Sequence, residues 1–209
     1  MYGGSGNDLL NGGNQRDLLV GDGGDDEING GNDSDSIFGR MDNDLLRGQN
    51  GNDTLFGGDG EDSLEGGNNR DRLAGGEDDD ILIGGADIDR LDGGSGSDTL
   101  TGGSGRDNFV FNELEEAEEA ADTITDFSPQ DDTMWFVTTG FAGISTRGMI
   151  SSQMLRIGSD ATTTSHRFIY SSGSGDLFYD RDGSGSAAKV LLAELDSGLA
   201  LTNADFRML

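Results

Sequence analysis

The chain lacks several residue types on which common structures and sites depend. Its 209 residues include no cysteine, which excludes disulfides and thiolate metal sites. His166 is the only histidine and leaves a histidine-based zinc site without a second imidazole. No apolar run approaches the roughly 20 residues of a membrane-spanning helix, so we expect no membrane insertion. The first twenty residues also do not form a signal peptide, so any export signal must lie elsewhere.

Basic residues are scarce as well. Lys and Arg number 13 against 41 Asp and Glu, which gives a net charge of −28. Nucleic acid and acidic membranes are therefore excluded as expected partners, because both attract proteins rich in Lys and Arg. Only 32% of the residues are hydrophobic, a composition typical of disordered acidic chains. The acidic residues are regularly spaced, however, which predicts that a counter-ion completes a folded structure.

What the sequence does contain is a nine-residue repeat. Twelve blocks run from Gly3 to Val110 without insertion or deletion, and each has Gly at position 1 and Asp at position 6. Position 8 is always apolar, from Leu10 to Phe109. The position 6 aspartates are Asp8, Asp17, Asp26, Asp35, Asp44, Asp53, Asp62, Asp71, Asp80, Asp89, Asp98 and Asp107. One carboxylate and one apolar side chain per block predict a solenoid that binds a cation.

The last three residues of each block suit an extended strand, and the first six suit a turn. Alternation along a strand then directs position 8 inward and positions 7 and 9 outward. So short a strand is stable only when neighbouring coils stack. Two blocks make one coil of 18 residues, which predicts six coils in a stack roughly 25–30 Å long. Position 4 is Gly, Asn or Asp in every block except that of Gln15, which predicts a left-handed turn residue there.

The blocks GGSGNDLLN, GGDGEDSLE and GGSGSDTLT resemble the hemolysin-type calcium-binding repeat of the RTX proteins. The resemblance implies an all-β fold, a right-handed parallel β-roll of 18-residue coils, followed by a small β-rich C-terminal cap. The chemistry agrees, because Ca²⁺ takes 6–8 hard oxygen ligands and tolerates irregular geometry better than Mg²⁺ does. Without a counter-ion, the stacked aspartates would repel one another.

The resemblance also implies a ligand set for each ion, which would lie between turns 18 residues apart. The earlier turn would contribute its aspartate and the carbonyls of positions 2 and 4, and the later turn its aspartate and the carbonyls of positions 1 and 3. The carbonyl positions carried over are Gly4, Gly6, Gly21 and Gly23; Gly13, Gln15, Gly30 and Asn32; Gly31, Asp33, Gly48 and Asn50; Gln49, Gly51, Gly66 and Asn68; Gly58, Gly60, Gly75 and Glu77; Gly67, Asn69, Gly84 and Ala86; Gly76, Asp78, Gly93 and Ser95; Gly85, Asp87, Gly102 and Ser104.

Twelve turns allow at most ten such sites, five along each edge of the roll. The repeats carry 25 acidic and 7 basic residues, net −18, which ten Ca²⁺ ions would nearly neutralise. Arg40 replaces the position 2 glycine beside Asp42 and Asp44. We expect the site it shares with Asp59 and Asp62 to be the weakest or to be empty.

The glycine and aspartate periodicity stops near Val110, which predicts two modules, residues 1–110 and 111–209. The stretch FVFNELEEAEEAADTITDFSPQDDTMWF resembles the segment that follows the repeats in secreted RTX proteins. A solenoid end needs a cap, and the residues expected to cover it are Ile124, Phe127, Trp135, Phe136 and Val137.

Within this second module the pattern predicts a hairpin of Phe168–Tyr170 with Leu177–Tyr179. Lys189–Leu195 is predicted as a further strand, and Thr202 with Asp205 as the cap of a short final helix.

Several other groups allow two interpretations. Asp122, Asp126 and Asp132 could form one more ion site under the cap or could cap turns. Asp180, Asp182 and Gly183 look like half of an EF-hand loop, but Leu192 stands where the loop needs an acidic residue, which favours a hairpin turn. Four acids are expected to form a solvated face rather than a glycosidase pair: Glu115, Glu116, Glu118 and Glu119. Three outward arginines are expected to pair with acids or to contact a polysaccharide: Arg47, Arg72 and Arg90.

These features favour a calcium-binding module of a secreted protein that folds on Ca²⁺ outside the cell and has no catalytic role. By resemblance, the C-terminal segment would carry a signal for the type I secretion machinery. The alternatives are the accessory tail of a protease, lipase or polysaccharide-modifying enzyme, or an adhesion module with a glycan ligand. Neither H-E-x-x-H nor G-x-S-x-G occurs. Met1 and Tyr2 fit positions 8 and 9 of a preceding block, so we expect the chain to be the C-terminal piece of a longer protein.

Overall fold

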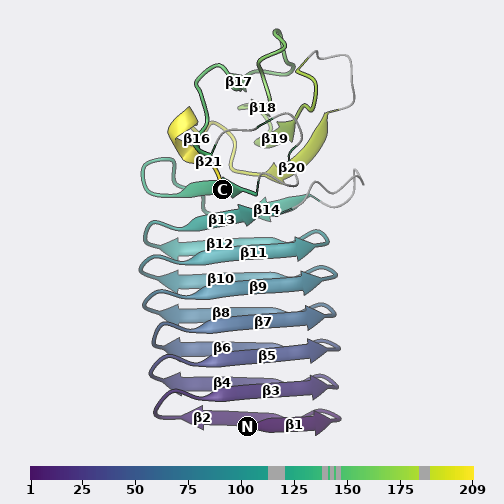
Figure 1. Ribbon diagram of the computed structural model, residues 1–209, viewed down its shortest axis with the longest axis vertical. Coiled ribbons are helices and arrows are strands. Elements are labelled where there is room, and N and C mark those ends of the chain that lie inside the picture. The colour runs from purple at the N-terminus through teal and green to yellow at the C-terminus, as the bar shows by residue number, and fades with distance from the viewer. Residues whose placement is uncertain (113–120, 138–140, 142–143, 145–146, 184–188) are drawn as a thin grey trace.

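The computed structural model describes residues 1–112, 121–137, 141, 144, 147–183 and 189–209. Successive coils stack along one axis, so that two parallel sheets face each other across a thin core (Figure 1). Strands of the repeat alternate between the two sheets, and each strand pairs with the strand 18 residues away in the sequence. The predicted all-β parallel β-roll with 18-residue coils is confirmed.

The first sheet contains, in spatial order, β1 (Tyr2–Ser5), β3 (Leu18–Gly23), β5 (Ser36–Met41), β7 (Thr54–Asp59), β9 (Arg72–Glu77), β11 (Arg90–Ser95), β13 (Asn108–Phe111), β15 (Thr133–Phe136), β21 (Phe206–Met208) and β16 (Gly148–Met149). The second sheet contains β2 (Leu9–Gly13), β4 (Glu27–Asn32), β6 (Leu45–Asn50), β8 (Ser63–Asn68), β10 (Ile81–Ala86), β12 (Thr99–Ser104), β14 (Asp122–Ile124), β20 (Val190–Glu194), β19 (Asp176–Tyr179), β18 (Phe168–Tyr170) and β17 (Leu155–Ile157).

The strands of the repeat are longer than the three residues predicted. From β3 to β12 each has six residues, covering positions 7–9 of one block and positions 1–3 of the next. Pairing continues through the glycines, as in Gly58 with Gly76. The prediction was wrong because positions 1–3, read as turn, also find a neighbouring strand to pair with once coils stack. Along each strand, positions 8 and 1 point inward.

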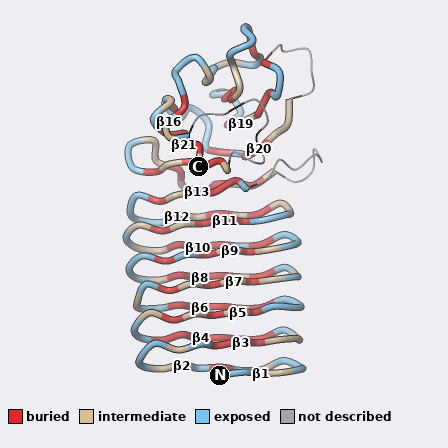
Figure 2. The backbone as a smooth tube through the Cα atoms, in the orientation of Figure 1, coloured by how far each residue is buried: buried red, intermediate tan, exposed pale blue. Residues whose placement is uncertain are grey.

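The position 8 column forms the core of the roll. Leu10 is 3% exposed and the other eleven members are completely buried. Figure 2 shows the burial concentrated on the strands, with exposed residues mostly in the turns. Burying each Leu or Ile contributes about 1.5–3 kcal/mol, so the stacked column is the main apolar contribution to stability. A single coil has no such column and cannot be stable alone.

Both sheets continue past Val110, where the repeat ends. Phe109 pairs with Met134 on β15, and Leu100 pairs with Ile124 on β14. One hydrophobic cluster extends from Leu10 to Met208. The change at residue 110 is therefore a change of sequence pattern, while the sheets and the core run on. The division into two modules stays a prediction.

The end of the roll is covered largely as expected. Ile124, Phe127 and Phe136 are buried. Trp135 and Val137 were wrongly predicted as cap residues, because strand alternation turns them to the outer face, where they are half-buried. Met134 fills the core in their place and is fully buried.

The predicted elements of the second module are confirmed. β18 and β19 form the antiparallel hairpin, and β20 pairs with β19. A 3-10 helix, η1 (Asn203–Asp205), follows Thr202, whose hydroxyl accepts a hydrogen bond from the Ala204 amide. Asp205 accepts one in return from the Thr202 amide at 2.6 Å, which completes the capping box.

Candidate metal sites

The aspartates of the repeat form a ladder along each edge of the roll. In each of the ten pairs within the repeat, the later aspartate accepts a hydrogen bond through Oδ1 from the backbone amide of the aspartate 18 residues earlier. The distances are 2.7 or 2.8 Å throughout. One oxygen of each carboxylate therefore locks the register of stacked turns.

The second carboxylate oxygen has a different environment. In the earlier aspartate of every predicted pair, Oδ2 is buried and has no hydrogen-bond partner among the described residues. These earlier members are Asp8, Asp17, Asp26, Asp35, Asp44, Asp53, Asp62, Asp71, Asp80 and Asp89. A buried carboxylate oxygen without a donor is unfavourable. A cation at this point would supply the missing interaction.

The pKa values of these carboxyl groups reflect the same environment. Burial, the largest cause, raises the pKa of Asp44 to about 7, although the hydrogen bond from the Asp26 amide opposes the shift. The negative charges of Asp62 and Asp26 raise it further. Burial likewise raises the pKa of Asp71 and of Asp80 to about 8. The ladder thus disfavours its own ionisation unless positive charge is added.

The position 1 glycines keep open the space beside each Oδ2. A Cβ added to Gly66 would lie 2.6 Å from Oδ2 of Asp71 and 2.7 Å from the carbonyl oxygen of Gly84. A Cβ on Gly3 would likewise lie 2.7 Å from Oδ2 of Asp8. The carboxylate oxygen of one turn and the position 1 carbonyl of the next coil therefore converge on one small space, which only glycine leaves free.

The remaining carbonyls also face the gap between stacked turns. A Cβ on Gly76 would collide with the carbonyl oxygen of Gly58 at position 2, and one on Gly96 with that of Asp78 at position 4. In the opposite direction, the position 3 carbonyl of Gly23 accepts a hydrogen bond from the Gly6 amide at 2.7 Å. The structure thus brings together backbone oxygens of the four positions that the resemblance implies, alongside the aspartates.

Such a set of oxygens fits a hard cation. Ca²⁺ is held by 6–8 oxygens that mix carboxylates with carbonyls, and a dication would supply the positive charge that the buried carboxylates lack. Among the described residues, no three His, Asp or Glu side chains gather to hold a metal. Backbone carbonyls must therefore provide most of the ligands, with one or two aspartates.

The turns require two left-handed residues rather than the single one predicted. Position 4 has positive φ in eleven of twelve blocks, including Gln15 at 76°, and Gly105 is the exception. Position 2 has positive φ in all twelve, including Arg40 at 98° and Gln49 at 75°. Sequence reasoning missed position 2, although nine of its twelve residues are glycine. Arg40 turns its side chain outward to Asp22 at 3.3 Å, and the weaker site at this turn stays a prediction.

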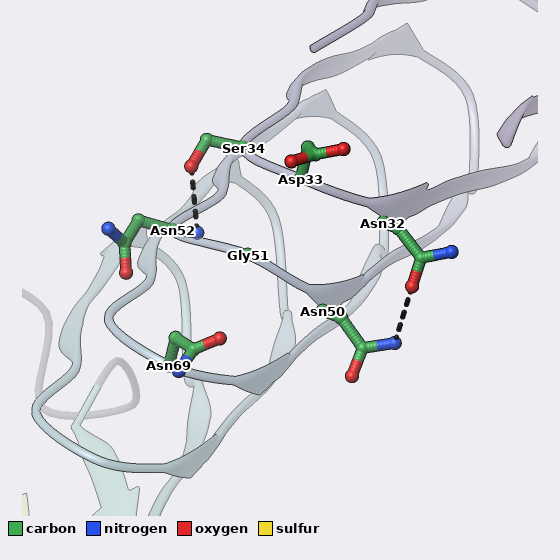
Figure 3. A pocket seen from close by; sticks show the side chains of 7 residues that line it. All are labelled: Asn32, Asp33, Ser34, Asn50, Gly51, Asn52 and Asn69. Carbon is green, nitrogen blue, oxygen red and sulfur yellow. Dashed lines mark hydrogen bonds between the residues drawn. The ribbon is translucent and has the colours of Figure 1, made fainter. Parts of the chain in front are cut away.

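The two edges of the roll differ outside the aspartate ladder. The turns 12–17, 30–35, 48–53, 66–71, 84–89 and 102–107 form what we call the asparagine edge. There the amides of Asn14, Asn32, Asn50 and Asn68 hydrogen-bond in series at 2.9, 3.1 and 2.9 Å. Figure 3 shows part of this ladder beside a shallow recess. It also shows the hydrogen bond from the backbone amide of Asn52 to the hydroxyl of Ser34. Side-chain amides thus help to hold this edge in register.

The opposite turns form what we call the acidic edge, at residues 3–8, 21–26, 39–44, 57–62, 75–80 and 93–98. Apart from the ladder aspartates, the turns of this edge carry eight acidic residues and one arginine, Arg40. The asparagine edge has two acidic residues and three arginines at the same positions. The acidic edge therefore has the stronger negative potential.

Carboxylates of the second module extend the ladder by one step on each edge. The Asp98 amide donates to Asp122 at 3.2 Å, and the Asp107 amide donates to Asp132 at 2.9 Å. Asp132 also accepts from the Ser128 amide at 2.8 Å. Asp126 accepts from the Gly102 and Gly103 amides at 2.9 and 2.7 Å. The Asp126 contacts agree with turn capping, whereas Asp122 and Asp132 repeat the ladder contact of the repeat. Both alternatives, turn capping and another ion site, stay predictions.

The other candidate residues have structural partners. Asp180 accepts from the amides of Asp182 and Gly183 at 3.2 and 2.8 Å, as the hairpin-turn interpretation expects. Nδ1 of His166 accepts from the Thr162 amide at 3.1 Å. The four predicted surface acids, Glu115, Glu116, Glu118 and Glu119, lie outside the described residues.

The three outward arginines do not behave alike. Arg47 pairs with Glu27 at 2.7 Å and with Glu65 at 3.8 Å on the second sheet, as predicted. Arg72 and Arg90 lie over aromatic rings of the first sheet instead.

Fold and site together define a class of protein, a parallel β-solenoid whose stacked turns converge oxygens on cation sites. The family model described as RTX calcium-binding nonapeptide repeat (4 copies) matches residues 2–37, 38–73 and 74–109, which is more than half of the chain. The chain belongs to this family, and its repeats bind calcium. RTX repeats are typical of extracellular proteins.

Among solved structures, the chain is similar to the AlgE6R3 subunit of the mannuronan C5-epimerase from Azotobacter vinelandii. The identity is 22%, the TM-score is 0.25, and the match covers 84% of this chain and 77% of that chain. At this TM-score the likeness supports no further conclusion. No curated protein matches the chain. Within the described residues, no helix has the length and apolar character needed to cross a membrane.

Proposed function

We propose that the chain is a non-catalytic module of a secreted protein and that calcium binding between its turns drives its folding outside the cell. The observation that carries the proposal is that, in each of the ten predicted pairs, the earlier aspartate has a buried Oδ2 with no hydrogen-bond partner in the part of the chain that the structure describes. A folded roll without cations would hold these oxygens side by side without compensation. Binding free energy would then be folding free energy.

The ligand set follows the resemblance and is consistent with the geometry. Each ion would lie between two turns of one edge, held by two aspartates and the carbonyls of positions 2 and 4 of the earlier turn and 1 and 3 of the later turn. Up to ten ions would fill the repeat and offset its charge of −18. Export by the type I secretion machinery rests on the resemblance of residues 111–209 alone. Comparing export of the full chain from cells with and without such an exporter tests it.

Circular dichroism of the full chain tests the coupling. In calcium-depleted buffer with a chelator we expect a largely unfolded spectrum, and excess Ca²⁺ should restore the β signal. Mg²⁺ at equal concentration should restore much less, because it demands a tighter octahedral site. A β spectrum that is the same with and without Ca²⁺ would refute the coupling.

A pair of variants separates specific ligation from general charge. Asp62→Asn removes a ladder carboxylate, whereas Asp59→Asn removes an exposed carboxylate of the same turn. The charge change is equal. We expect Asp62→Asn to raise the calcium concentration at the folding midpoint several-fold and Asp59→Asn to change it little. Equal shifts would indicate that only net charge matters and would contradict the proposed sites.

A further inference from the structure

The outer face of the first sheet carries a row of residues that calcium binding does not explain. Position 9 of every second block and its continuation in the cap are aligned by strand pairing. The aligned column is Tyr2, Val20, Phe38, Phe56, Ala74, Asp92, Val110, Trp135 and Arg207. Arg72 and Arg90 lie in the adjacent column and are directly paired in register.

Aromatic rings and guanidinium groups stack along this face. The Phe38 and Phe56 rings are parallel to within 9°, with centroids 5.1 Å apart, and the Arg72 guanidinium lies 5.7 Å from the Phe56 centroid. Arg90 and Arg207 lie 5.8 and 5.7 Å from the Trp135 centroid. We call these six residues the aromatic–arginine stripe. It crosses seven strands, from β5 to β21, and is therefore about 30 Å long.

The protein offsets the positive charge of the stripe only in part, because one carboxylate, Asp92, lies near enough to act on Arg72 and Arg90. Within the parts of the chain that the structure describes, none of its three arginines forms an ion pair with a carboxylate. Asp92, the only acid in the aligned column, is 8% exposed and accepts a hydrogen bond from Asn112 at 2.5 Å. Nε of Arg90 is buried without an acceptor among the described residues. Like charges paired across neighbouring strands, as in Arg72 and Arg90, are unfavourable.

The second sheet provides the contrast. Its outward arginine, Arg47, lies between Glu27 and Glu65 and pairs with both. In a chain of net charge −28, the described part of the first sheet presents three guanidinium groups beside aromatic rings and one buried carboxylate, Asp92, among them. Such a face is complementary to an anionic ligand.

We propose that the aromatic–arginine stripe binds an acidic polysaccharide whose sugar rings carry carboxylates. The planar guanidinium group matches a carboxylate through two parallel hydrogen bonds, and aromatic rings pack against the apolar faces of sugars. The stripe runs across the strands, whereas a peptide added by β-pairing would need a free sheet edge. Single-stranded nucleic acid also combines anionic groups with rings that can stack on aromatic side chains, so it enters the test below as the competing ligand.

The test uses the full chain at one fixed, saturating Ca²⁺ concentration and short oligogalacturonates as the probe. Trp135 is the only tryptophan, so its fluorescence reports binding at the stripe, with isothermal calorimetry as a second readout. The test variant is Arg72→Gln/Arg207→Gln, because both side chains are exposed. The matched control is Arg70→Gln/Arg106→Gln, which removes the same charge from the asparagine edge.

We expect the stripe variant to weaken binding roughly tenfold or more and the control to change it less than about twofold. Both variants should keep the calcium midpoint of the wild type. Equal weakening in both variants, no binding by the wild type, equal binding of neutral dextran, or tighter binding of single-stranded DNA would each overturn the proposal. Binding is compared between variants that are all folded, so the result does not depend on whether folding requires calcium. The proposal of polysaccharide binding and the proposal of calcium-driven folding can therefore fail separately.

Discussion

The two edges of the roll repeat the same aspartate ladder within very different turns. On both edges each ladder aspartate after the first accepts a hydrogen bond from the backbone of the previous coil at 2.7 or 2.8 Å. Beyond the ladder, the acidic edge adds eight carboxylates, whereas the asparagine edge adds two carboxylates, three arginines and a chain of side-chain amides.

This contrast separates what the site requires from what it tolerates. Position 1 must be glycine because a Cβ would enter the space beside Oδ2, and position 6 must supply the carboxylate. Positions 3 and 5 point outward and can be acidic, amide or basic. The asparagine edge holds its register partly through amide hydrogen bonds, which need no ion, whereas the acidic edge must overcome additional repulsion. We therefore expect the acidic edge to depend more on calcium.

The largest expected effect is a pH dependence of folding, which comes from the raised pKa values of the ladder aspartates that both edges share. Folding raises these values above the unfolded value near 3.8, to about 7 for Asp44 and about 8 for Asp71, mainly by burial. The folded state therefore binds more protons. Protonation of the buried carboxyl groups therefore stabilises the folded state. This stabilisation is fully present below about pH 4 and is lost as the pH rises through about 6–8. In calcium-depleted buffer the β signal should increase from pH 8 to pH 5. A decrease over that range would contradict the assigned burial of the carboxylates.

The next largest effect should come from closing the glycine space on either edge. Gly57→Ala and Gly66→Ala would each place a methyl group against Oδ2 of the ladder aspartate. We expect a loss on the order of 3 kcal/mol or more in Ca²⁺, measured by urea unfolding. Gly23→Ala is the control, since nothing lies within 4 Å of its added Cβ. If both edge variants unfolded like this control, the proposed position of the ion would be wrong.

A smaller difference should distinguish the edges at position 3. Asn50→Ala removes two amide hydrogen bonds, to Asn32 and from Asn68, and should cost about 1–2 kcal/mol. Asp59→Ala, its counterpart on the acidic edge, removes one of several like charges and should change stability by less than about 0.5 kcal/mol or increase it. Urea unfolding at saturating Ca²⁺ measures both. Equal losses would show that the amide ladder does not stabilise its edge.

The smallest effect concerns backbone strain at position 2. Gln49 and Arg40 adopt φ of 75° and 98°, where glycine has no steric cost. Gln49→Gly should stabilise the asparagine edge by about 0.5–1 kcal/mol. Arg40→Gly should gain less, because it also loses the ion pair with Asp22. Thermal unfolding in excess Ca²⁺ compares them, and destabilisation by Gln49→Gly would contradict the strain argument.

The sequence predicted those features of the fold that depend on a residue type repeated at one position of every block. The inward Leu and Ile of position 8 and the aspartates of position 6 were sufficient to predict the coil length, the stacking and the cation. Strand length was underestimated because pairing of Gly58 with Gly76 exists only between coils. Trp135 does not cover the end of the roll as expected, because strand alternation turns Met134 inward and Trp135 outward. The amide ladder and the unpartnered Oδ2 atoms are relations between residues 18 apart, which no single block reveals.

Anomalous scattering from crystals grown in excess Ca²⁺, at a wavelength where calcium scatters anomalously, tests the central claim most directly. The account predicts calcium peaks between stacked turns on both edges, each beside the buried Oδ2 of the earlier aspartate of a predicted pair, for which the described residues offer no hydrogen-bond donor. A folded roll with no anomalous peak between its turns, or with peaks only on its outer faces, would contradict it.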